Sequence, residues 1–349
     1  MRAALMQEYG EPLVLDEVAA PQLEDDNDVI VRIAAAGVCG SDVHIRSGAH
    51  VENLGRADMP YRLGHENVGF VHELGRAAAA QGFEVGDPVV LHPLISCGLC
   101  RSCRAGNDMY CEAPAFPGID GRTHGGFAEF MRTGVRSLVP LVPGTDPVPL
   151  TPLTDAGLTA YHAVKKLLPL IAPGHTAAVV GSGGVGQFAI QLLASLTPAR
   201  VIATDVSSAR LEAATAAGAD VVIGAEPDGD GGAAVRDLTD GRGVDVVFDC
   251  VGIAPSIADS AGMLCRGGVL SVLGASDAPV PMSTAQYTGM EISVIGNYVG
   301  TYTDLVELVA LFDAGTVTCH HQRYALDDAE QALLDLAAGR MIGRGVLVP

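Results

Sequence analysis

Four cysteines are crowded into one short stretch of the 349-residue sequence. Their spacing is C-x2-C-x2-C-x7-C, and they are Cys97, Cys100, Cys103 and Cys111. Four thiolates this close together can surround one tetrahedral Zn²⁺ without a helix or sheet to hold them. Such an ion has no open coordination position, so the spacing predicts a structural zinc. An iron–sulfur cluster also fits the ligand count. Buried cysteines without a ligand are the third alternative, although a polar loop gives them no packing partner.

A second group of ligand-type side chains precedes this loop. Cys39, Ser41 and His44 stand within six residues of one another, and His65 and Glu66 follow. A catalytic zinc needs about three protein ligands and one exchangeable position. The thiolate of Cys39 and the imidazole of His65 would supply two ligands. Glu66 would be either an exchanging ligand or a carboxylate that supports the ligands from behind.

We expect the third ligand at Asp155. This residue ends a segment with five prolines, Val139 to Asp155, which is typical of a rigid crossing between domains. The alternative is that Asp155 caps the helix that begins after it. A thiolate, an imidazole and a carboxylate together predict a zinc ion that polarises a substrate oxygen at its open position.

A glycine-rich turn further along the chain predicts a nucleotide site. The run GSGGVG follows an apolar strand and opens an amphipathic helix, so its backbone can approach a pyrophosphate. The turn residues expected to contact the cofactor are Gly181, Gly183, Gly184, Val185 and Gly186. Asp205 ends the next strand, nineteen residues after Gly186. A carboxylate there can bind both hydroxyls of the adenosine ribose and repel a 2′-phosphate, which favours NAD over NADP. Arg210 would contact the adenine or a phosphate, or else be a solvated helix residue.

The elements that must position these residues fall into two patterns. Short β-rich runs punctuated by glycine and proline dominate up to about residue 153, which predicts an irregular β domain. From Thr176 onward six apolar strands alternate with helical stretches, which predicts a doubly wound parallel sheet. The tail from Thr301 is expected to return to the first domain. The predicted division is therefore 1–153 with 300–349, and 154–299.

The composition of the chain limits the kinds of partner and the cellular compartment that we expect for it. A formal charge of −20 opposes approach to nucleic acid or to an anionic membrane surface. No apolar span is long enough for a membrane helix, and the first residues are too acidic for a signal peptide. Eight cysteines without the pattern of a disulfide scaffold are typical of a reducing compartment. We therefore expect a cytoplasmic protein that acts on a small molecule.

In this order, and over nearly the whole chain, these motifs resemble the zinc-dependent alcohol dehydrogenases of the medium-chain dehydrogenase/reductase family. The run PLTDAGLTAYHA around Asp155 is similar to bacterial NAD-dependent secondary-alcohol dehydrogenases. The resemblance implies an α/β protein with a GroES-like catalytic domain, a Rossmann cofactor domain and a cleft between them. It implies hydride transfer between NAD and an alcohol, with a ketone or aldehyde as product, and two zinc ions per chain.

The resemblance also implies roles for further residues. Ser41 and His44 would relay the alcohol proton. The residues expected to line the nicotinamide and pyrophosphate are Val251, Leu273, Asn297 and Arg344. A homodimer or homotetramer is implied as well. Two other functions stay open at this point: a polyol or threonine-type amino-alcohol dehydrogenase on the same scaffold, and a zinc- and nucleotide-binding regulator without turnover.

Overall fold

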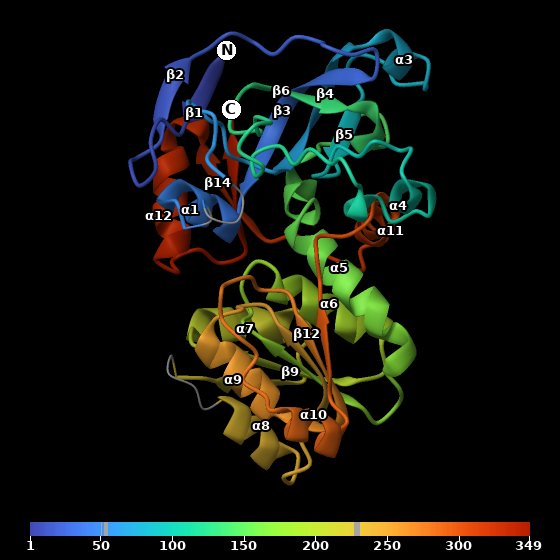
Figure 1. Cartoon of the computed structure of the whole chain (residues 1–349), viewed down its shortest axis with the longest axis vertical. Coiled ribbons are helices and arrows are strands. Elements are labelled where there is room, and N and C mark those ends of the chain that lie inside the picture. The colour runs from blue at the N-terminus through green and yellow to red at the C-terminus, as the bar shows by residue number, and fades with distance from the viewer. Residues whose placement is uncertain (50, 52–54, 227–230) are drawn as a thin grey trace. The chain divides into compact units, whose positions relative to one another are not determined.

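The computed structural model describes residues 1–49, 51, 55–226 and 231–349 (Figure 1). These residues form two compact units. The first unit consists of Met1–Asp155, Thr301–Val309 and Cys319–Pro349, and the second of Ala156–Gly300 and Ala310–Thr318.

The segment Ala310–Thr318 differs from the predicted division, which assigned the whole tail to the first domain. The contacts of Thr318 give the physical reason. Its backbone N–H donates to Oε1 of Gln191 at 2.8 Å, and Nε2 of Gln191 donates to the Thr318 carbonyl at 3.1 Å. No pattern in the sequence of this segment reveals which of the two units it contacts.

The first unit is built on a seven-stranded sheet in the order β14-β15-β3-β4-β5-β7, with β6 also paired to β3. β3 is its longest strand and is buried along most of its length, because it pairs with β4, β6 and β15. A separate antiparallel pair, β1 and β2, completes the strands. The strands are β1 (Arg2–Leu5), β2 (Val14–Glu17), β3 (Asp28–Val38), β4 (Glu66–Leu74), β5 (Pro88–Leu91), β6 (Phe130–Gly134), β7 (Leu138–Pro140), β14 (His321–Ala325) and β15 (Arg344–Val348).

Short helices connect these strands. They are α1 (Gly40–Ser47), α3 (Arg76–Ala79), α4 (Arg101–Arg104), α12 (Ala329–Ala337) and the 3₁₀ turns η1 (Asp108–Tyr110), η2 (Val135–Ser137), η3 (Val148–Leu153) and η5 (Leu326–Asp328), and α11 (Tyr302–Asp313) begins in this unit. The sequence did not predict α1, because it offers only Ile45 as a buried apolar residue. Its ends are fixed instead by Asp42, which accepts from the Cys39 N–H at 2.8 Å, and by left-handed Gly48.

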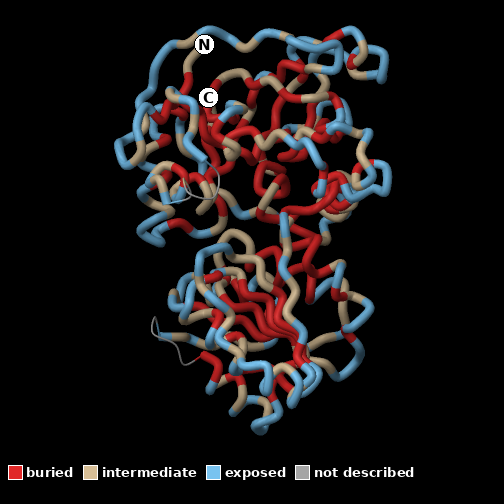
Figure 2. The backbone as a smooth tube through the Cα atoms, viewed as in Figure 1, coloured by how far each residue is buried: buried red, intermediate tan, exposed pale blue. Residues whose placement is uncertain are grey.

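The second unit contains the six-stranded parallel sheet that the sequence predicted. Its strand order is β10-β9-β8-β11-β12-β13, which is 3-2-1-4-5-6 when the strands are numbered within the unit. This is the order of a doubly wound dinucleotide-binding sheet, so the predicted fold class is confirmed. The strands are β8 (Thr176–Val180), β9 (Arg200–Asp205), β10 (Val221–Gly224), β11 (Val244–Asp249), β12 (Leu264–Val272) and β13 (Ser293–Gly296). Figure 2 shows that the central strands are the most buried part of this unit.

Helices cover both faces of the parallel sheet (Figure 1). They are α5 (Ala156–Leu167), the 3₁₀ turn η4 (Leu168–Leu170), α6 (Gly186–Leu196), α7 (Ser208–Ala216), α8 (Gly231–Leu238), α9 (Ala254–Gly262) and α10 (Thr284–Met290). The sequence did not predict α10, which buries no residue. A capping box stabilises it, because Ser283 and Gln286 each accept the other's backbone N–H. Among the residues described here, none of the helices is both long and apolar enough to cross a bilayer.

Candidate active site

Three of the predicted ligands converge in the first unit. Cys39 directly precedes α1, His65 directly precedes β4, and Asp155 directly precedes α5. The first two are brought together by the antiparallel register of β3 and β4, in which Gly37 is paired with Glu66. Cys39, His65, Glu66 and Asp155 each place a ligand atom within 4.8 Å of the others. We call these four residues the mixed cluster.

The spacing of the donor atoms fits a tetrahedral zinc ion. Sγ of Cys39 lies 3.5 Å from Oδ2 of Asp155, and Nε2 of His65 lies 3.4 Å from the same oxygen. Ordinary Zn–S, Zn–N and Zn–O bonds at tetrahedral angles separate sulfur from oxygen by about 3.6 Å and nitrogen from oxygen by about 3.4 Å. Both separations therefore suit one ion bound by all three side chains. A soft thiolate with an imidazole and one carboxylate is also a donor set that zinc prefers.

Glu66 is paired with an arginine. Both carboxylate oxygens of Glu66 accept hydrogen bonds from the Arg344 guanidinium, and the bond from Nε measures 2.8 Å. A second guanidinium nitrogen of Arg344 lies 3.6 Å from Oδ2 of Asp155. Gly37 makes room for the carboxylate, because a side chain there would overlap Glu66. Glu66 thus belongs to the cluster but is committed to a buried ion pair.

The structure places Arg344 beside the mixed cluster. It lies on β15 and is only 4% exposed. The register of β15 against β3 pairs Gly345 with Val38, which brings Arg344 next to Glu66. A contact between Arg344 and the cofactor stays a prediction.

Asp42 is a functional residue that the sequence analysis missed. Its fully buried carboxylate accepts hydrogen bonds from the backbone N–H groups of Cys39 at 2.8 Å and of Gly64 at 3.2 Å. The same carboxylate lies 3.4 Å from Nδ1 of His65. It therefore connects the backbone of one ligand with the ring of another. An acidic residue three positions after a cysteine that precedes a helix was the available signal.

Opposite charges inside the mixed cluster shift the pKa values of two of its side chains. Burial alone would lower the pKa of His65, but the carboxylates of Asp42 and Asp155 outweigh it and hold this pKa well above its usual range. Burial would raise the pKa of Asp155, yet His65 and Arg344 hold it well below its usual range. Zinc needs an unprotonated ring nitrogen on His65, so binding of the ion would displace any proton held there.

The two residues of the expected proton relay lie on α1. The Ser41 hydroxyl is 3.8 Å from Sγ of Cys39, and Ser41 is half-buried. His44 is exposed one helical turn further along. Residues three positions apart share one helix face. The two side chains therefore start on one face of α1, with Ser41 near Cys39 and His44 exposed.

The four cysteines form a separate cluster, which we call the four-cysteine loop. It surrounds α4 and η1, and its sulfur atoms lie within 4.8 Å of one another. Sγ of Cys97 is 4.0 Å from Sγ of Cys103, close to the roughly 3.8 Å expected for two thiolates on one tetrahedral zinc. Backbone N–H groups of Leu99 and Cys100 point at Sγ of Cys97, and they lower the pKa of that thiol to about 6. Burial raises the pKa of the Cys103 thiol to about 12, so the case for zinc rests on the spacing of the four sulfur atoms.

The glycine-rich turn joins β8 to α6 in the second unit. Gly181 has a positive φ of 84°, and a side chain there would overlap Val251. At Gly186 a side chain would overlap the carbonyl of Gly181, so only glycine allows the helix to start this close to the strand. Gly183 has open space where its side chain would be. These three positions match the three roles of a pyrophosphate-binding turn. Gly184 and Val185 lie between them at the start of α6.

Asp205 ends β9, where the sequence predicted it. Its Oδ2 accepts from the Ser182 N–H at 2.7 Å and its Oδ1 from the Ser207 N–H at 2.9 Å. A guanidinium nitrogen of Arg210 lies 3.9 Å from Oδ1. Asp205 is therefore fixed against the glycine-rich turn, and each oxygen keeps a lone pair for a ribose hydroxyl.

The other predicted cofactor contacts lie at the carboxyl ends of the parallel strands. Val251 follows β11, Leu273 follows β12 and Asn297 follows β13. The Leu273 N–H donates to the Asp249 carbonyl at 2.8 Å, which ties two of these turns together. Within the described residues, two buried polar atoms here have no hydrogen-bond partner: Oγ of Ser182 and Oδ1 of Asn297. Buried polar atoms are rarely left unpaired, so this edge fits a polar ligand such as a dinucleotide.

Comparisons with known proteins agree with this arrangement. Residues 25–143 match the alcohol dehydrogenase GroES-like domain, and residues 184–314 match the zinc-binding dehydrogenase domain. An NAD-dependent alcohol dehydrogenase of Sulfurisphaera tokodaii is 33% identical, and the match covers 100% of both chains. The sorbitol dehydrogenase of Bacillus subtilis is 28% identical over 95% of this chain and 92% of its own. The crystal structure of the alcohol dehydrogenase from Aeropyrum pernix has 43% identity and a TM-score of 0.96, covering 100% of both chains.

The chain therefore belongs to the zinc-dependent alcohol dehydrogenases of the medium-chain dehydrogenase/reductase family. It is an oxidoreductase with NAD and zinc as cofactors, as the sequence predicted. A regulator without turnover is set aside.

Proposed function

We propose that the chain oxidises a secondary alcohol to a ketone with NAD⁺, and reduces the ketone in reverse, at a zinc ion held by Cys39, His65 and Asp155. The proposal depends on one observation. Sγ of Cys39 and Nε2 of His65 lie 3.5 and 3.4 Å from the same oxygen of Asp155. The name of the Sulfurisphaera tokodaii relative, an NAD-dependent alcohol dehydrogenase, supports the reaction class.

Bound zinc supplies Lewis-acid polarisation of the substrate oxygen. The side chains of the mixed cluster hold the ion, and Asp42 keeps His65 in a fixed orientation from behind. The Ser41 hydroxyl accepts the proton of the substrate alcohol and passes its own proton toward His44 at the surface. Arg344 balances the charge of Glu66 and Asp155, so that the site does not carry two uncompensated buried carboxylates.

The reaction is tested by mixing the zinc-loaded chain with NAD⁺ and a panel of alcohols, and following the NADH absorbance band. Paired R and S secondary alcohols, a primary alcohol, sorbitol and threonine separate the candidate substrate classes. We expect the fastest turnover with one enantiomer of a secondary alcohol. No NADH with any alcohol, in enzyme shown to hold zinc, would contradict the proposal.

NAD preference rests on Asp205. A carboxylate fixed at the end of β9 would face a 2′-phosphate of like charge, so NADP⁺ is expected to be disfavoured by roughly 10³-fold in kcat/KM. Asp205→Gly removes that repulsion together with the ribose contacts. We therefore expect KM for NAD⁺ to rise and KM for NADP⁺ to fall. A parent enzyme that uses both cofactors equally would show that Asp205 does not recognise the ribose.

A polyol is the second candidate substrate, because the Bacillus subtilis relative is named a sorbitol dehydrogenase. Both reactions begin with the same zinc set, so only the substrate panel separates them. A kcat/KM for sorbitol above that for simple secondary alcohols would favour this candidate.

We further propose a homodimer or homotetramer in the cytoplasm. β13 is an edge strand of the parallel sheet, and an edge strand can pair with the same strand of a second copy. All eight cysteines are free thiols, which agrees with a reducing compartment. Light scattering of the purified chain tests the first statement, and fractionation of the source cells tests the second.

A further inference from the structure

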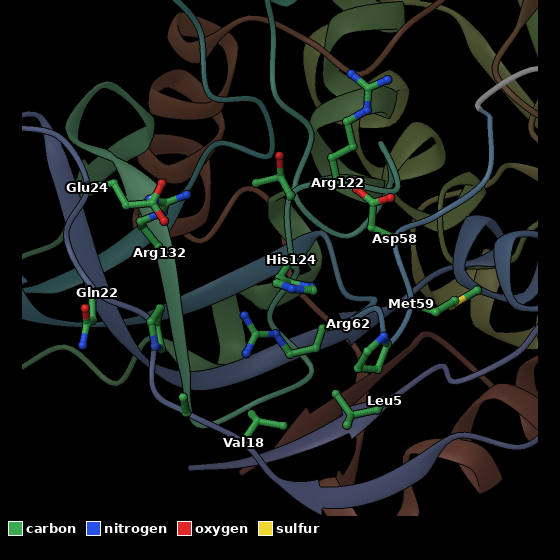
Figure 3. A pocket seen from close by; sticks show the side chains of 14 residues that line it. Leu5, Val18, Gln22, Glu24, Asp58, Met59, Arg62, Arg122, His124 and Arg132 are labelled. Atoms are coloured by element: carbon green, nitrogen blue, oxygen red, sulfur yellow. The ribbon is translucent and has the colours of Figure 1, made fainter.

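A cavity of about 520 Å³ lies in the first unit (Figure 3). It is bordered by the segment after β2, by residues 58–62, by the loop 122–124 and by Arg132 of β6. None of its lining residues is a member of the mixed cluster or of the four-cysteine loop. The established reaction therefore does not account for it.

Arg62 is the unusual residue of this cavity. Its side chain lines the cavity (Figure 3), and the residue is only 7% exposed. Its Nε is buried without a hydrogen-bond partner, and within the described ranges no ion pair reaches its guanidinium. Arg344 shows the contrast, because it is 4% exposed and paired with Glu66. A buried charge normally has such a partner.

The neighbouring charges do not neutralise Arg62. Arg132, also on the cavity wall, is already paired with Glu24 and lies 3.5 Å from Asp28. Asp58 lines the cavity but forms no salt bridge with Arg62 among the described residues. Burial lowers the pKa of Arg62 to about 10, so the side chain still carries its charge at neutral pH. Burial and the nearby arginines also lower the pKa of His124, which is then a neutral hydrogen-bonding group beside it.

The rest of the wall is mixed, because it includes the exposed Arg122 as well as hydrocarbon surface. Leu5, Val18, Met59 and Pro60 contribute hydrocarbon surface to the same cavity. The guanidinium groups of this lining outnumber its carboxylates, and they stand beside hydrocarbon surface. Such a wall is complementary to an anionic head on an apolar body.

We propose that this cavity binds a small organic anion, with its carboxylate or phosphate on Arg62 and its apolar part against Leu5, Val18 and Met59. A planar guanidinium can bind either head through two parallel hydrogen bonds. The site shares no lining residue with the mixed cluster, so its occupant is not the alcohol that the zinc site oxidises.

Calorimetry on the zinc-loaded chain with four probes tests the proposal: acetate, hexanoate, inorganic phosphate and hexyl phosphate. We expect the two probes with a hydrocarbon tail to bind more tightly than acetate and inorganic phosphate, and the stronger of the two tailed probes identifies the head group. Arg62→Met should weaken binding at least about tenfold, because one charge-assisted contact is lost. The matched control is Arg323→Met, an exposed arginine of the same unit outside the cavity, which should bind like the parent. Equal binding by Arg62→Met and the parent would overturn the proposal.

Two further measurements separate binding in the cavity from binding at the catalytic zinc and from a purely structural role of Arg62. A carboxylate can also bind a catalytic zinc, so the Cys39→Ser variant should keep its binding of hexanoate, and loss of binding in that variant would overturn the proposal. In buffer without organic anions, Arg62→Met should unfold at the same temperature as the parent or higher, because an unpaired buried charge is removed. A lower unfolding temperature would mean that the chain itself satisfies Arg62, which would also overturn it. If Arg62→Met does not fold, diffraction from parent crystals soaked in a bromine-labelled hexanoate decides, because the head group must lie on Arg62.

Discussion

The mixed cluster takes its ligands from three distant parts of the chain, whereas the four-cysteine loop takes all of its ligands from the fifteen residues between Cys97 and Cys111. The mixed cluster is surrounded by a buried framework of hydrogen bonds through Asp42 and Arg344. In the four-cysteine loop backbone N–H groups point at the sulfur atoms, and Cys97 is exposed.

This difference indicates whether the fold or the metal ion organises the ligands of each cluster. The fold positions the ligands of the mixed cluster before any metal binds, because Asp42 and the pairing of β3 with β4 already fix them. Such preorganisation suits a site that must keep one position open for substrate. In the four-cysteine loop the metal organises the chain, because two turns of short helix and a few N–H···S contacts cannot order it alone. Loss of a ligand should therefore affect turnover in one cluster and stability in the other.

The largest effect is expected from removing a ligand of the mixed cluster. Cys39→Ser and His65→Ala should each lower kcat by roughly 10³-fold or more, because Lewis-acid stabilisation of several kcal/mol is lost. Thermal unfolding and NAD binding should stay close to the parent, and metal analysis should give about one zinc per chain instead of about two. Cys319→Ser is the matched control, since Cys319 is a half-buried thiol outside both clusters. Full activity in either ligand variant would contradict the assignment.

Replacing Ser41 tests whether a side chain beside the mixed cluster carries the substrate proton away. The four-cysteine loop binds no substrate and needs no such path. Ser41→Ala should lower kcat by about 10²-fold, the lower end of the usual contribution of general acid–base catalysis. Zinc content should not change, because the hydroxyl is 3.8 Å from Cys39 and is not among the clustered ligand atoms. Ser41→Thr keeps the hydroxyl and should restore most of the rate. An unchanged kcat and pH profile in Ser41→Ala would exclude Ser41 from the proton path.

Asp42 tests whether the fold, rather than the metal, positions His65. Asp42→Asn keeps the size of the side chain but weakens its contact with the ring, so zinc affinity of the mixed cluster should fall roughly 10–100-fold. Added zinc should then restore the parent kcat, which a directly catalytic residue would not allow. A variant with parent-like zinc affinity would show that Asp42 does not position the ligand.

The sequence predicted the local features of this molecule better than the distant ones. The four-cysteine spacing and the six strands of the parallel sheet are short-range patterns, and the structure contains both groupings. Asp155 was reached through its place after a proline-rich segment, and the structure brings it to Cys39 and His65. The role of Arg344 was not predictable in this way, because it follows from the register of β15 against β3, and its partner Glu66 lies 278 residues away along the chain. Arg62 was missed for a similar reason, since only burial reveals that it lacks a partner.

The smallest change in turnover is expected when a ligand of the four-cysteine loop is replaced. This variant tests most directly whether the two clusters have different roles. Cys103→Ser replaces a buried ligand, so the loop should lose its zinc and the unfolding temperature should fall, on the order of 10 °C for a loss of several kcal/mol. Measured well below that temperature, kcat should stay within about threefold of the parent, because the ligands of the mixed cluster are fixed by other elements and a catalytic effect of that size is under 1 kcal/mol. Limited proteolysis should cut the variant between Cys97 and Cys111 and leave the parent intact. If instead Cys103→Ser keeps both zinc ions and unfolds like the parent, the metal does not organise this loop. If it loses turnover as completely as Cys39→Ser, the two clusters are not independent and the contrast between them fails.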